Sequence, residues 1–156
     1  MAGDTLFQVA ALNTAYASVI DADRLEDWPA FFHADCLYKI TTAENVRKGY
    51  QAGIVYADSR GMLEDRVAAL RRANIYERQS YRHIISLPVI ITDDAAGVRA
   101  ETPFLVVRTM RTGEMSIFAA GLYLDHVRET DGVLRFAERI VVCDSQRFDT
   151  LLAIPL

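Results

Sequence analysis

The second half of this sequence consists of long segments with the composition of β-strands, separated only by short turns. The four segments cover residues 83–92, 98–109, 116–128 and 134–144. Their connections, TDDAAG, RTGE and ETDG, contain the Asp and Gly residues that tight hairpin turns need. Strands joined by hairpins lie antiparallel, so we predict an antiparallel meander that makes up most of one sheet.

Alternation along these segments predicts which side chains share a side of the sheet, because successive residues of a strand point to opposite sides. One side of the third segment carries Phe118, Ala120, Leu122 and Leu124. One side of the last segment carries Leu134, Phe136, Ile140 and Val142, with Glu138 among them. We expect each of these rows to lie on one side of the sheet.

The first half of the chain begins with a helical pattern. Residues 4–20 place Leu6, Val9, Tyr16 and Ile20 on one wide face of a helix. The next segment, DADRLEDWPAFFHADC, predicts a short helix or a pair of turns, because Pro29 interrupts regular hydrogen bonding. Its three aromatic residues are expected in the core: Trp28, Phe31 and Phe32. Strands are predicted at residues 36–41 and near 54–57.

A second amphipathic helix is expected to begin at Arg60. Asp58 and Ser59 precede it, and their side-chain oxygens can accept the free N–H groups of a first helical turn. The helix carries one apolar stripe: Leu63, Val67 and Leu70. Helices followed by a curved antiparallel sheet make an α+β sandwich with the helices on one face. This order resembles the cone-shaped, cystatin-like fold of nuclear transport factor 2 and ketosteroid isomerase.

Composition limits the classes of function. The 156 residues, 51% of them hydrophobic and 24% charged, are expected to form a single domain over residues 1–156. The formal net charge of −4 argues against a nucleic-acid partner. No apolar stretch approaches the roughly 20 residues of a membrane span. With only Cys36 and Cys143 and no signal segment, we expect a cytoplasmic protein with reduced thiols and no membrane partner.

The sequence contains no motif typical of a metal or cofactor site. Its histidines, His33, His83 and His126, form no helical pair of ligands. The Cys-x-His and Cys-x-x-His pairs of a Rieske cluster are absent, as are a P-loop, a dinucleotide fingerprint and a nucleophile elbow. We therefore expect no catalytic residue, no cofactor-binding residue and no metal ligand in this chain.

A cone-shaped fold can nevertheless enclose a pocket for acid–base chemistry. The candidates are Tyr38, Tyr56, Asp58, His83 and Glu138, since burial moves the pKa of a carboxylate or an imidazole toward neutrality. Structural explanations compete with this role: Asp58 as a helix cap, Tyr38 in the core, and Glu138 as the partner of an arginine such as Arg108 or Arg139.

One segment is rich in amphipathic side chains with polar tips. Within residues 76–83 it holds Tyr76, Glu77, Arg78, Tyr81, Arg82 and His83. Tyr and Arg are enriched at the centres of protein–protein interfaces, because each buries a large surface and keeps directional hydrogen bonds. Two interpretations stay open at this point: an interface, or a solvated loop with two tyrosines in the core.

Three segments in this order are similar to the small (beta) subunit of aromatic-ring-hydroxylating Rieske dioxygenases: WPAFFHADCLYKI, GIVYADSRGMLEDRVAALRRANIYERQSYRHIIS and RIVVCDS. The similarity covers nearly the whole chain. Four shorter segments most resemble the terephthalate 1,2-dioxygenase branch of that family: GIVYADS, MLEDR, ANIYER and LLAIPL.

The resemblance implies a non-catalytic, structural role. In this family the large (alpha) subunit holds a Rieske [2Fe-2S] cluster and a mononuclear Fe(II) and binds the aromatic substrate. A reductase supplies electrons from NAD(P)H, and dioxygen is added to the aromatic ring to give a cis-dihydrodiol. The aromatic substrate of this branch is terephthalate. The small subunits form a trimer in an alpha3beta3 assembly.

The resemblance also implies a set of subunit contacts. The residues expected at an interface are Arg66, Tyr76, Arg78, Tyr81, Arg82, His83 and Leu156. Arg66, next to Asp65, borders the apolar face of its helix and can anchor a neighbouring loop or subunit by charge-assisted hydrogen bonds. Residues 151–156 are apolar, so we expect them to be exposed in a monomer and covered by a neighbour.

Two other functions are compatible with the same fold. One is a stand-alone pocket enzyme of the isomerase or dehydratase kind, which would turn over a small ligand without iron. The other is a binding or dimerisation module, which would form a stable homo-oligomer independent of any Rieske protein.

Overall fold

The computed structural model describes residues 2–51, 53–73, 79–146 and 154–156. Its helical elements are α1 (Ala2–Asp21), the 3-10 turns η1 (Leu25–Asp27) and η2 (Pro29–Phe31), α2 (Ala43–Arg47) and α3 (Arg60–Ala73). Its strands are β1 (Phe32–Thr42), β2 (Val55–Ala57), β3 (Gln79–Ile85), β4 (Val89–Asp94), β5 (Gly97–Met110), β6 (Met115–Thr130) and β7 (Val133–Cys143). The predicted order of helices and strands is confirmed, except that α2 was not predicted and that β3 and β4 replace a single predicted strand.

The strands form one sheet in the order β2-β1-β7-β6-β5-β3, and β4 pairs with β5 beside β3. β5, β6 and β7 are an antiparallel meander, as predicted. The expectation of a wholly antiparallel sheet is wrong at one pair: β1 runs parallel to β7, with Ile40 opposite Val141. β1 and β7 are far apart in the chain, so no hairpin forces them to run in opposite directions.

The first predicted long strand is in fact two strands. β3 and β4 both pair with β5 along the same edge of the sheet, and residues 86–88 separate them. The last hydrogen bond before this break runs from Ser86 N–H to the Pro103 carbonyl, at 3.1 Å. Pro88 has no N–H group and cannot donate to β5. The edge strand of the sheet is therefore interrupted at this point.

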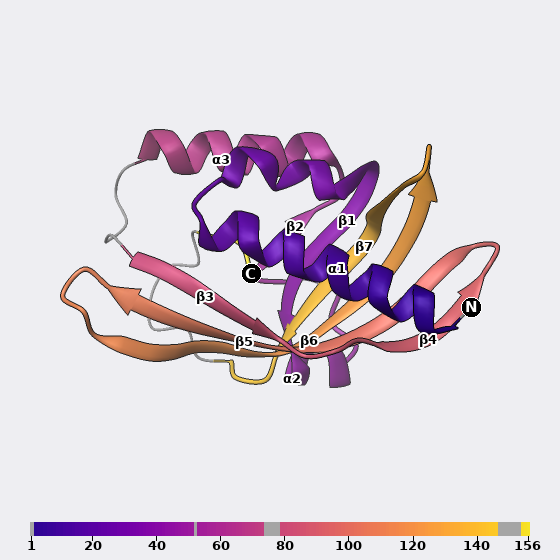
Figure 1. Cartoon of the computed structure of the whole chain (residues 1–156). Helices are drawn as coiled ribbons and strands as arrows, with labels where there is room; N and C mark the ends of the chain where they lie inside the picture. Colours follow the sequence, from indigo (N-terminus) through magenta and orange to yellow (C-terminus); the bar gives the residue numbers. More distant parts are fainter. Residues whose placement is uncertain (1, 52, 74–78, 147–153) are drawn as a thin grey trace.

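Both long helices lie on one face of the curved sheet, as predicted (Figure 1). α3 buries Leu63, Val67 and Leu70. Ser59 caps this helix, because its Oγ accepts the Met62 N–H at 3.2 Å. Asp58 is exposed, and its main-chain N–H donates to the Met62 sulfur. The predicted start of the helix is therefore confirmed, and of the two predicted caps Ser59 is the one that accepts a helical N–H group.

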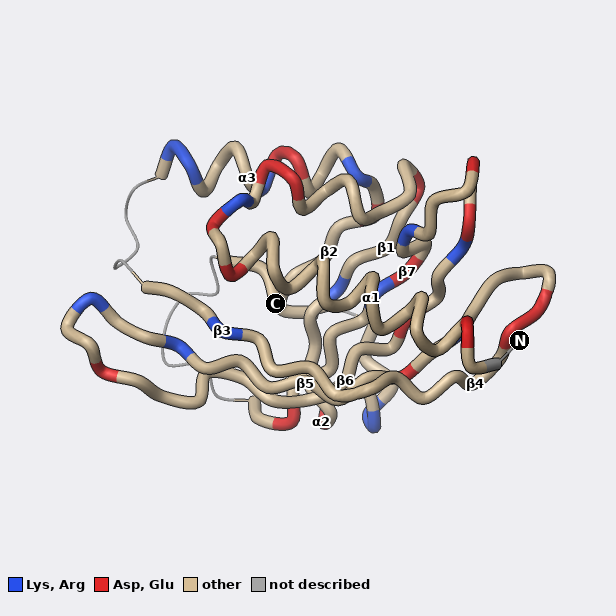
Figure 2. The backbone as a smooth tube through the Cα atoms, in the orientation of Figure 1, with Lys and Arg blue, Asp and Glu red and all other residues tan. Residues whose placement is uncertain are grey.

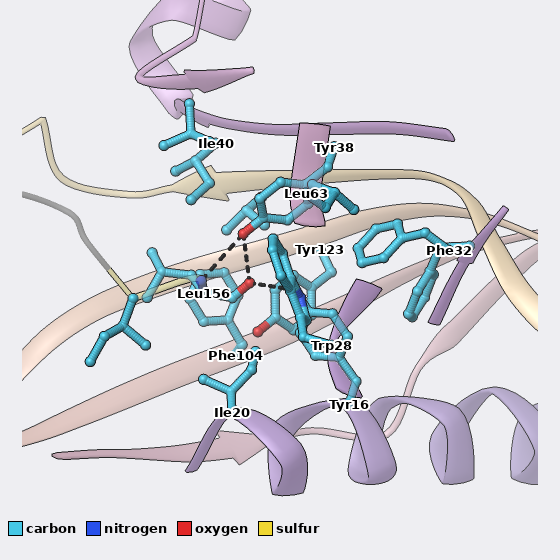
Figure 3. Close-up of a cluster of buried hydrophobic side chains, with 14 of the residues drawn as sticks. Tyr16, Ile20, Trp28, Phe32, Tyr38, Ile40, Leu63, Phe104, Tyr123 and Leu156 are labelled. Atoms are coloured by element: carbon cyan, nitrogen blue, oxygen red, sulfur yellow. Dashed lines mark hydrogen bonds between the residues drawn. The ribbon is translucent and has the colours of Figure 1, made fainter. Parts of the chain in front are cut away.

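An aromatic core fills the space between α1, β1 and the meander (Figure 3). Trp28 and Phe32 are buried and Phe31 is half-buried, so their predicted role in the core is confirmed. The Trp28 ring meets Phe32 and Tyr38 edge-on, at centroid distances of 5.7 and 5.2 Å. Edge-on contacts of this kind add to the stabilisation from burial.

Two β-bulges make the predicted strand faces wrong. Val106 lies opposite Ala119 and Val107 lies opposite Ile117, so Phe118 is an extra residue in β6. Ala137 is likewise an extra residue in β7. A bulge shifts the alternation of every residue beyond it to the other face. The buried face of β6 therefore carries Tyr123, Asp125 and Val127, whereas Leu122 and Leu124 point to the other face of the sheet.

Candidate subunit interface

The three residues predicted to mark an interface, Tyr81, Arg82 and His83, lie on β3 at the edge of the sheet. Strand alternation separates them: Tyr81 and His83 are buried beneath α1, and Arg82 is exposed on the opposite face with Ile84. Of these three predicted residues, only Arg82 offers its side chain to a partner in this conformation.

His83 is held inside the chain by Asp21, the last residue of α1. One Asp21 oxygen lies 2.7 Å from His83 Nδ1, and the other accepts the His83 main-chain N–H at 2.8 Å. Both side chains are buried, and the His83 Nε2 atom has no hydrogen-bond partner among the described residues. The pair fixes the end of the helix to the strand, which gives His83 a structural role within this chain.

The other predicted interface residues have different surroundings. Arg66 is half-buried on α3 and borders a shallow hollow with Tyr56 and Met62. Tyr76 and Arg78 lie outside the described residues. Leu156 is fully buried in the core of its own chain, and Ile154 is buried with it. The expectation that the chain end is exposed is therefore wrong for residues 154–156, because their apolar side chains find cover inside the chain.

The face of the sheet away from α1 and α3 is apolar over β3, β5, β6 and β7. We call it the outer apolar face, and it consists of Ile84, Leu105, Val107, Ile117, Leu122, Leu124 and Ile140. Cross-strand registers place Ile84 beside Leu105, Val107 beside Ile117, and Leu124 beside Ile140. The exposed fraction is 71% for Ile117 and 55% for Ile84.

Charges are sparse over the middle of this face. Figure 2 shows few Lys, Arg, Asp or Glu residues along the central parts of β5 and β6. Arg82, which lies opposite Val107, and Glu101, which lies opposite Leu124, stand at its margins. An apolar centre with charged margins is the usual arrangement of a protein–protein interface. Strand alternation without the bulge at Phe118 places Leu122 and Leu124 on the same side as Phe118, so the sequence alone does not reveal this face.

The five candidates for a catalytic pocket do not come together. Tyr38 is buried in the aromatic core, and His83 is bound to Asp21. Tyr56 and Asp58 are exposed. Glu138 lies opposite His126, just beyond the β7 bulge. The predicted partner Arg139 points to the core instead and pairs with Asp125, so that proposed ion pair of Glu138 is wrong.

A buried polar network, which was not predicted from the sequence, crosses the core. Arg139 Nε and Nη2 donate to the two Asp125 oxygens at 2.8 and 2.7 Å, and Nη2 also donates to Asn13 Oδ1. Asn13 Nδ2 donates to Thr102 Oγ1 at 3.3 Å. The guanidinium also lies 3.9 Å from the ring centroid of Tyr123. The network links α1 to β5, β6 and β7, and its geometry is that of a structural ion pair.

A metal centre does not fit the described part of this chain. Within it, no group of three or more His, Cys, Asp or Glu residues comes close enough to hold a metal ion. Cys36 and Cys143 are buried and unpaired with each other, and burial raises the pKa of their thiols to about 11 and about 12. A thiol kept protonated is a poor metal ligand.

No helix in the described residues is long and apolar enough to cross a membrane.

A family model described as "Ring hydroxylating beta subunit" matches residues 15–150. This chain belongs to the ring-hydroxylating beta-subunit family. The sequence resemblance is thereby confirmed. Members are small subunits that associate with a large oxygenase subunit, within an oxidoreductase complex. A stand-alone enzyme or binding module is correspondingly disfavoured.

Individual relatives support this membership. The beta 1 subunit of the terminal oxygenase component of terephthalate 1,2-dioxygenase from Comamonas sp. is 55% identical over 149 residues, or 96% of this chain and 97% of that subunit. The anthranilate 1,2-dioxygenase small subunit of Burkholderia cepacia is 40% identical over 97% of this chain and 94% of its own length.

A solved structure gives the same result for this beta subunit. A chain described as the beta subunit of an aromatic-ring-hydroxylating dioxygenase from Novosphingobium aromaticivorans superposes with a TM-score of 0.92. The match covers 99% of both chains at 40% identity. The cone-shaped α+β fold predicted from the sequence is therefore the fold of the family.

Proposed function

We propose that this chain is the structural small subunit of a terephthalate 1,2-dioxygenase. The observation that most supports the proposal is its 55% identity to the Comamonas sp. beta 1 subunit over 149 residues. The lower identity of 40% to the anthranilate 1,2-dioxygenase small subunit favours the terephthalate branch. The substrate acted on by the complex is then terephthalate, which it converts to a cis-dihydrodiol.

In this proposal the reactive groups belong to other chains. The large subunit carries the Rieske [2Fe-2S] cluster, the mononuclear Fe(II) and the substrate site, and a reductase feeds it from NAD(P)H. The small subunit supplies a rigid support for an alpha3beta3 assembly in the cytoplasm. The poor fit of the described residues to a metal centre supports this division.

The outer apolar face is the surface that we assign to subunit contact. Its most exposed residues, Ile117 and Ile84, leave most of their apolar surface in contact with water in the isolated chain. Burying apolar surface stabilises an assembly by about 25 cal/mol per Å² before the costs of association are subtracted. Arg82 at the margin of this face can add a charge-assisted hydrogen bond to a partner.

Reconstitution of the complex tests the function. Large subunit, reductase and NADH are mixed with or without this chain, and consumption of terephthalate and of anthranilate is followed. We expect dihydroxylation of terephthalate only when this chain is present, and slower reaction of anthranilate. Full activity of the large subunit without this chain would contradict a supporting role, and preference for anthranilate would contradict the assigned branch.

A further inference from the structure

The main-chain oxygen of Leu156 accepts hydrogen bonds from two tyrosine hydroxyls. Tyr16 on α1 donates at 2.7 Å, and Tyr38 on β1 donates at 3.0 Å. The Leu156 N–H in turn donates to the Tyr38 hydroxyl at 3.3 Å. Figure 3 shows the two tyrosines reaching Leu156 from different elements. The two hydroxyl donors thus form a binding site for one main-chain oxygen in the middle of the core.

The two tyrosines are suited to act as donors. Burial raises the pKa of both phenols, most strongly for Tyr38. Each hydroxyl therefore stays protonated at neutral pH, where it donates to an oxygen and cannot repel it as a phenolate. A carbonyl or carboxylate oxygen is the complementary group.

The surrounding side chains complete a cage of aromatic rings. Trp28 meets Tyr38 edge-on, and Tyr123 stacks on Phe104 at a centroid distance of 4.5 Å. The buried Tyr123 hydroxyl has no hydrogen-bond partner among the described residues. The cage thus provides an apolar enclosure for a branched aliphatic side chain and contains a hydroxyl that Leu156 leaves unused (Figure 3).

The cage is close to the surface on one side. Ile154, two residues before Leu156, borders a hollow beside Ile20, Asp21 and Tyr81, between the end of α1 and β3. Residues 154–156 therefore extend from this hollow to the two tyrosine hydroxyls. The same route would serve a short peptide arriving from solution.

We propose that this cage is a binding site for a short apolar peptide, which residues 154–156 occupy within their own chain. The site recognises a main-chain carbonyl through Tyr16 and Tyr38, and it encloses the branched side chain that accompanies this carbonyl. When residues 154–156 are removed, the segment Ile-Pro-Leu can bind the emptied site from solution. This inference concerns the inside of the cone and does not depend on the proposed dioxygenase assembly.

The test uses a chain that lacks residues 154–156 and the peptide acetyl-Ile-Pro-Leu. Trp28 is the only tryptophan of the sequence and a neighbour of Tyr38, so its fluorescence reports occupation of the cage. We expect a saturable change in the shortened chain and none in the full chain, whose site is occupied. Acetyl-Ile-Pro-Asp, whose charged side chain does not suit the cage, is the matched control peptide. The absence of saturable binding, or equal binding of both peptides, would overturn the proposal.

Tyrosine variants distinguish this binding site from general hydrophobic binding. In the shortened chain, Tyr38→Phe is expected to weaken peptide binding roughly tenfold, the usual consequence of losing one or two hydrogen bonds. Tyr56→Phe, at the exposed position of β2, is the control and should leave the affinity unchanged.

A second measurement on the full chain applies even if the shortened chain does not fold. The Leu156 amide donates to Tyr38, so Tyr38→Phe should accelerate its hydrogen exchange roughly tenfold relative to Tyr56→Phe. Exchange at equal rates in the two variants would show that Tyr38 does not hold the chain end, and the proposal would fail.

Discussion

Arg139 and Asp125 face each other across the β6–β7 hairpin, with both side chains fully buried and two hydrogen bonds of 2.8 and 2.7 Å between them. The pair lies beneath α1 and is extended by Asn13. A charge in this position is stable only while its partner is present, because water cannot replace the partner.

The first prediction concerns this pair. Asp125→Ala leaves the Arg139 charge buried and unpaired, which should lower the free energy of unfolding by about 3–5 kcal/mol. Urea unfolding followed by Trp28 fluorescence measures the loss. Glu138→Gln, next to Arg139 but only half-buried, is the control and should change stability by less than about 0.5 kcal/mol. Similar small effects of both substitutions would refute the structural role of the pair.

A second prediction tests the contact between α1 and β3. Asp21→Ala removes the acceptor of the His83 ring and of the His83 main-chain N–H. Leaving buried donors unpaired costs about 1–3 kcal/mol, so β3 should exchange its amide hydrogens faster than β6. Asp23→Ala, two residues on and exposed, serves as the comparison. Unchanged exchange in β3 of Asp21→Ala would contradict this account.

The third prediction is a pH dependence. Hydrogen bonds from Arg71 lower the pKa of Glu26 from 4.5 to about 2. Since the folded-state pKa is depressed, this stabilisation is present above pH 4.5 and is lost as the pH falls toward 2. Glu26 is largely exposed, so the contribution is about 0.2–1 kcal/mol. Wild type should therefore lose more stability than Glu26→Gln between pH 4.5 and 2. Parallel stability curves for the two proteins would exclude the pairing.

The fourth prediction concerns the thiols. Burial raises the pKa of Cys36 to about 11 and that of Cys143 to about 12, so the reactive thiolate is scarce at pH 8. A disulfide reagent should label neither thiol of the native protein within minutes and both after unfolding in urea. Rapid labelling of the native protein would mean that these residues are accessible.

A fifth prediction tests the outer apolar face. Ile117→Glu places a charge at the most exposed residue of this face, beside Val107, and should weaken association with the large subunit by at least tenfold in a pull-down titration. Phe7→Glu is a matched control, because Phe7 is equally exposed, at 70%, but lies on α1. Both variants should keep the wild-type unfolding temperature within about 2 °C. Equal binding of the two variants to the large subunit would exclude this face as the contact.

The spacing of apolar residues and the turn residues predicted the helices and the meander, because both depend on residues close together in the sequence. The stripe Leu63, Val67 and Leu70 identified the buried side of α3, and the Asp/Gly turns identified the meander. The extra residues Phe118 and Ala137 were not predictable, because a bulge depends on how two strands pair. Both errors in strand face follow from these two residues.

The orientation of the candidate interface residues could be predicted only in part, for the same reason. Tyr81, Arg82 and His83 were identified as one unit by composition, but strand alternation directs Arg82 outward and the other two inward. The inward orientation of Arg139 depends on Asp125, which lies on the neighbouring strand. Contacts between distant residues decide such orientations, and a single sequence does not contain them explicitly.

The central claim is that this chain is an iron-free support for a large oxygenase subunit. Its most direct test is the native mass and iron content of the chain, expressed alone and together with a Rieske-type large subunit. We predict no iron in the isolated chain, and a joint complex near 200 kDa, a rough value for six domain-sized or larger chains. Iron bound to the isolated chain, or separate elution of the two subunits, would contradict the claim.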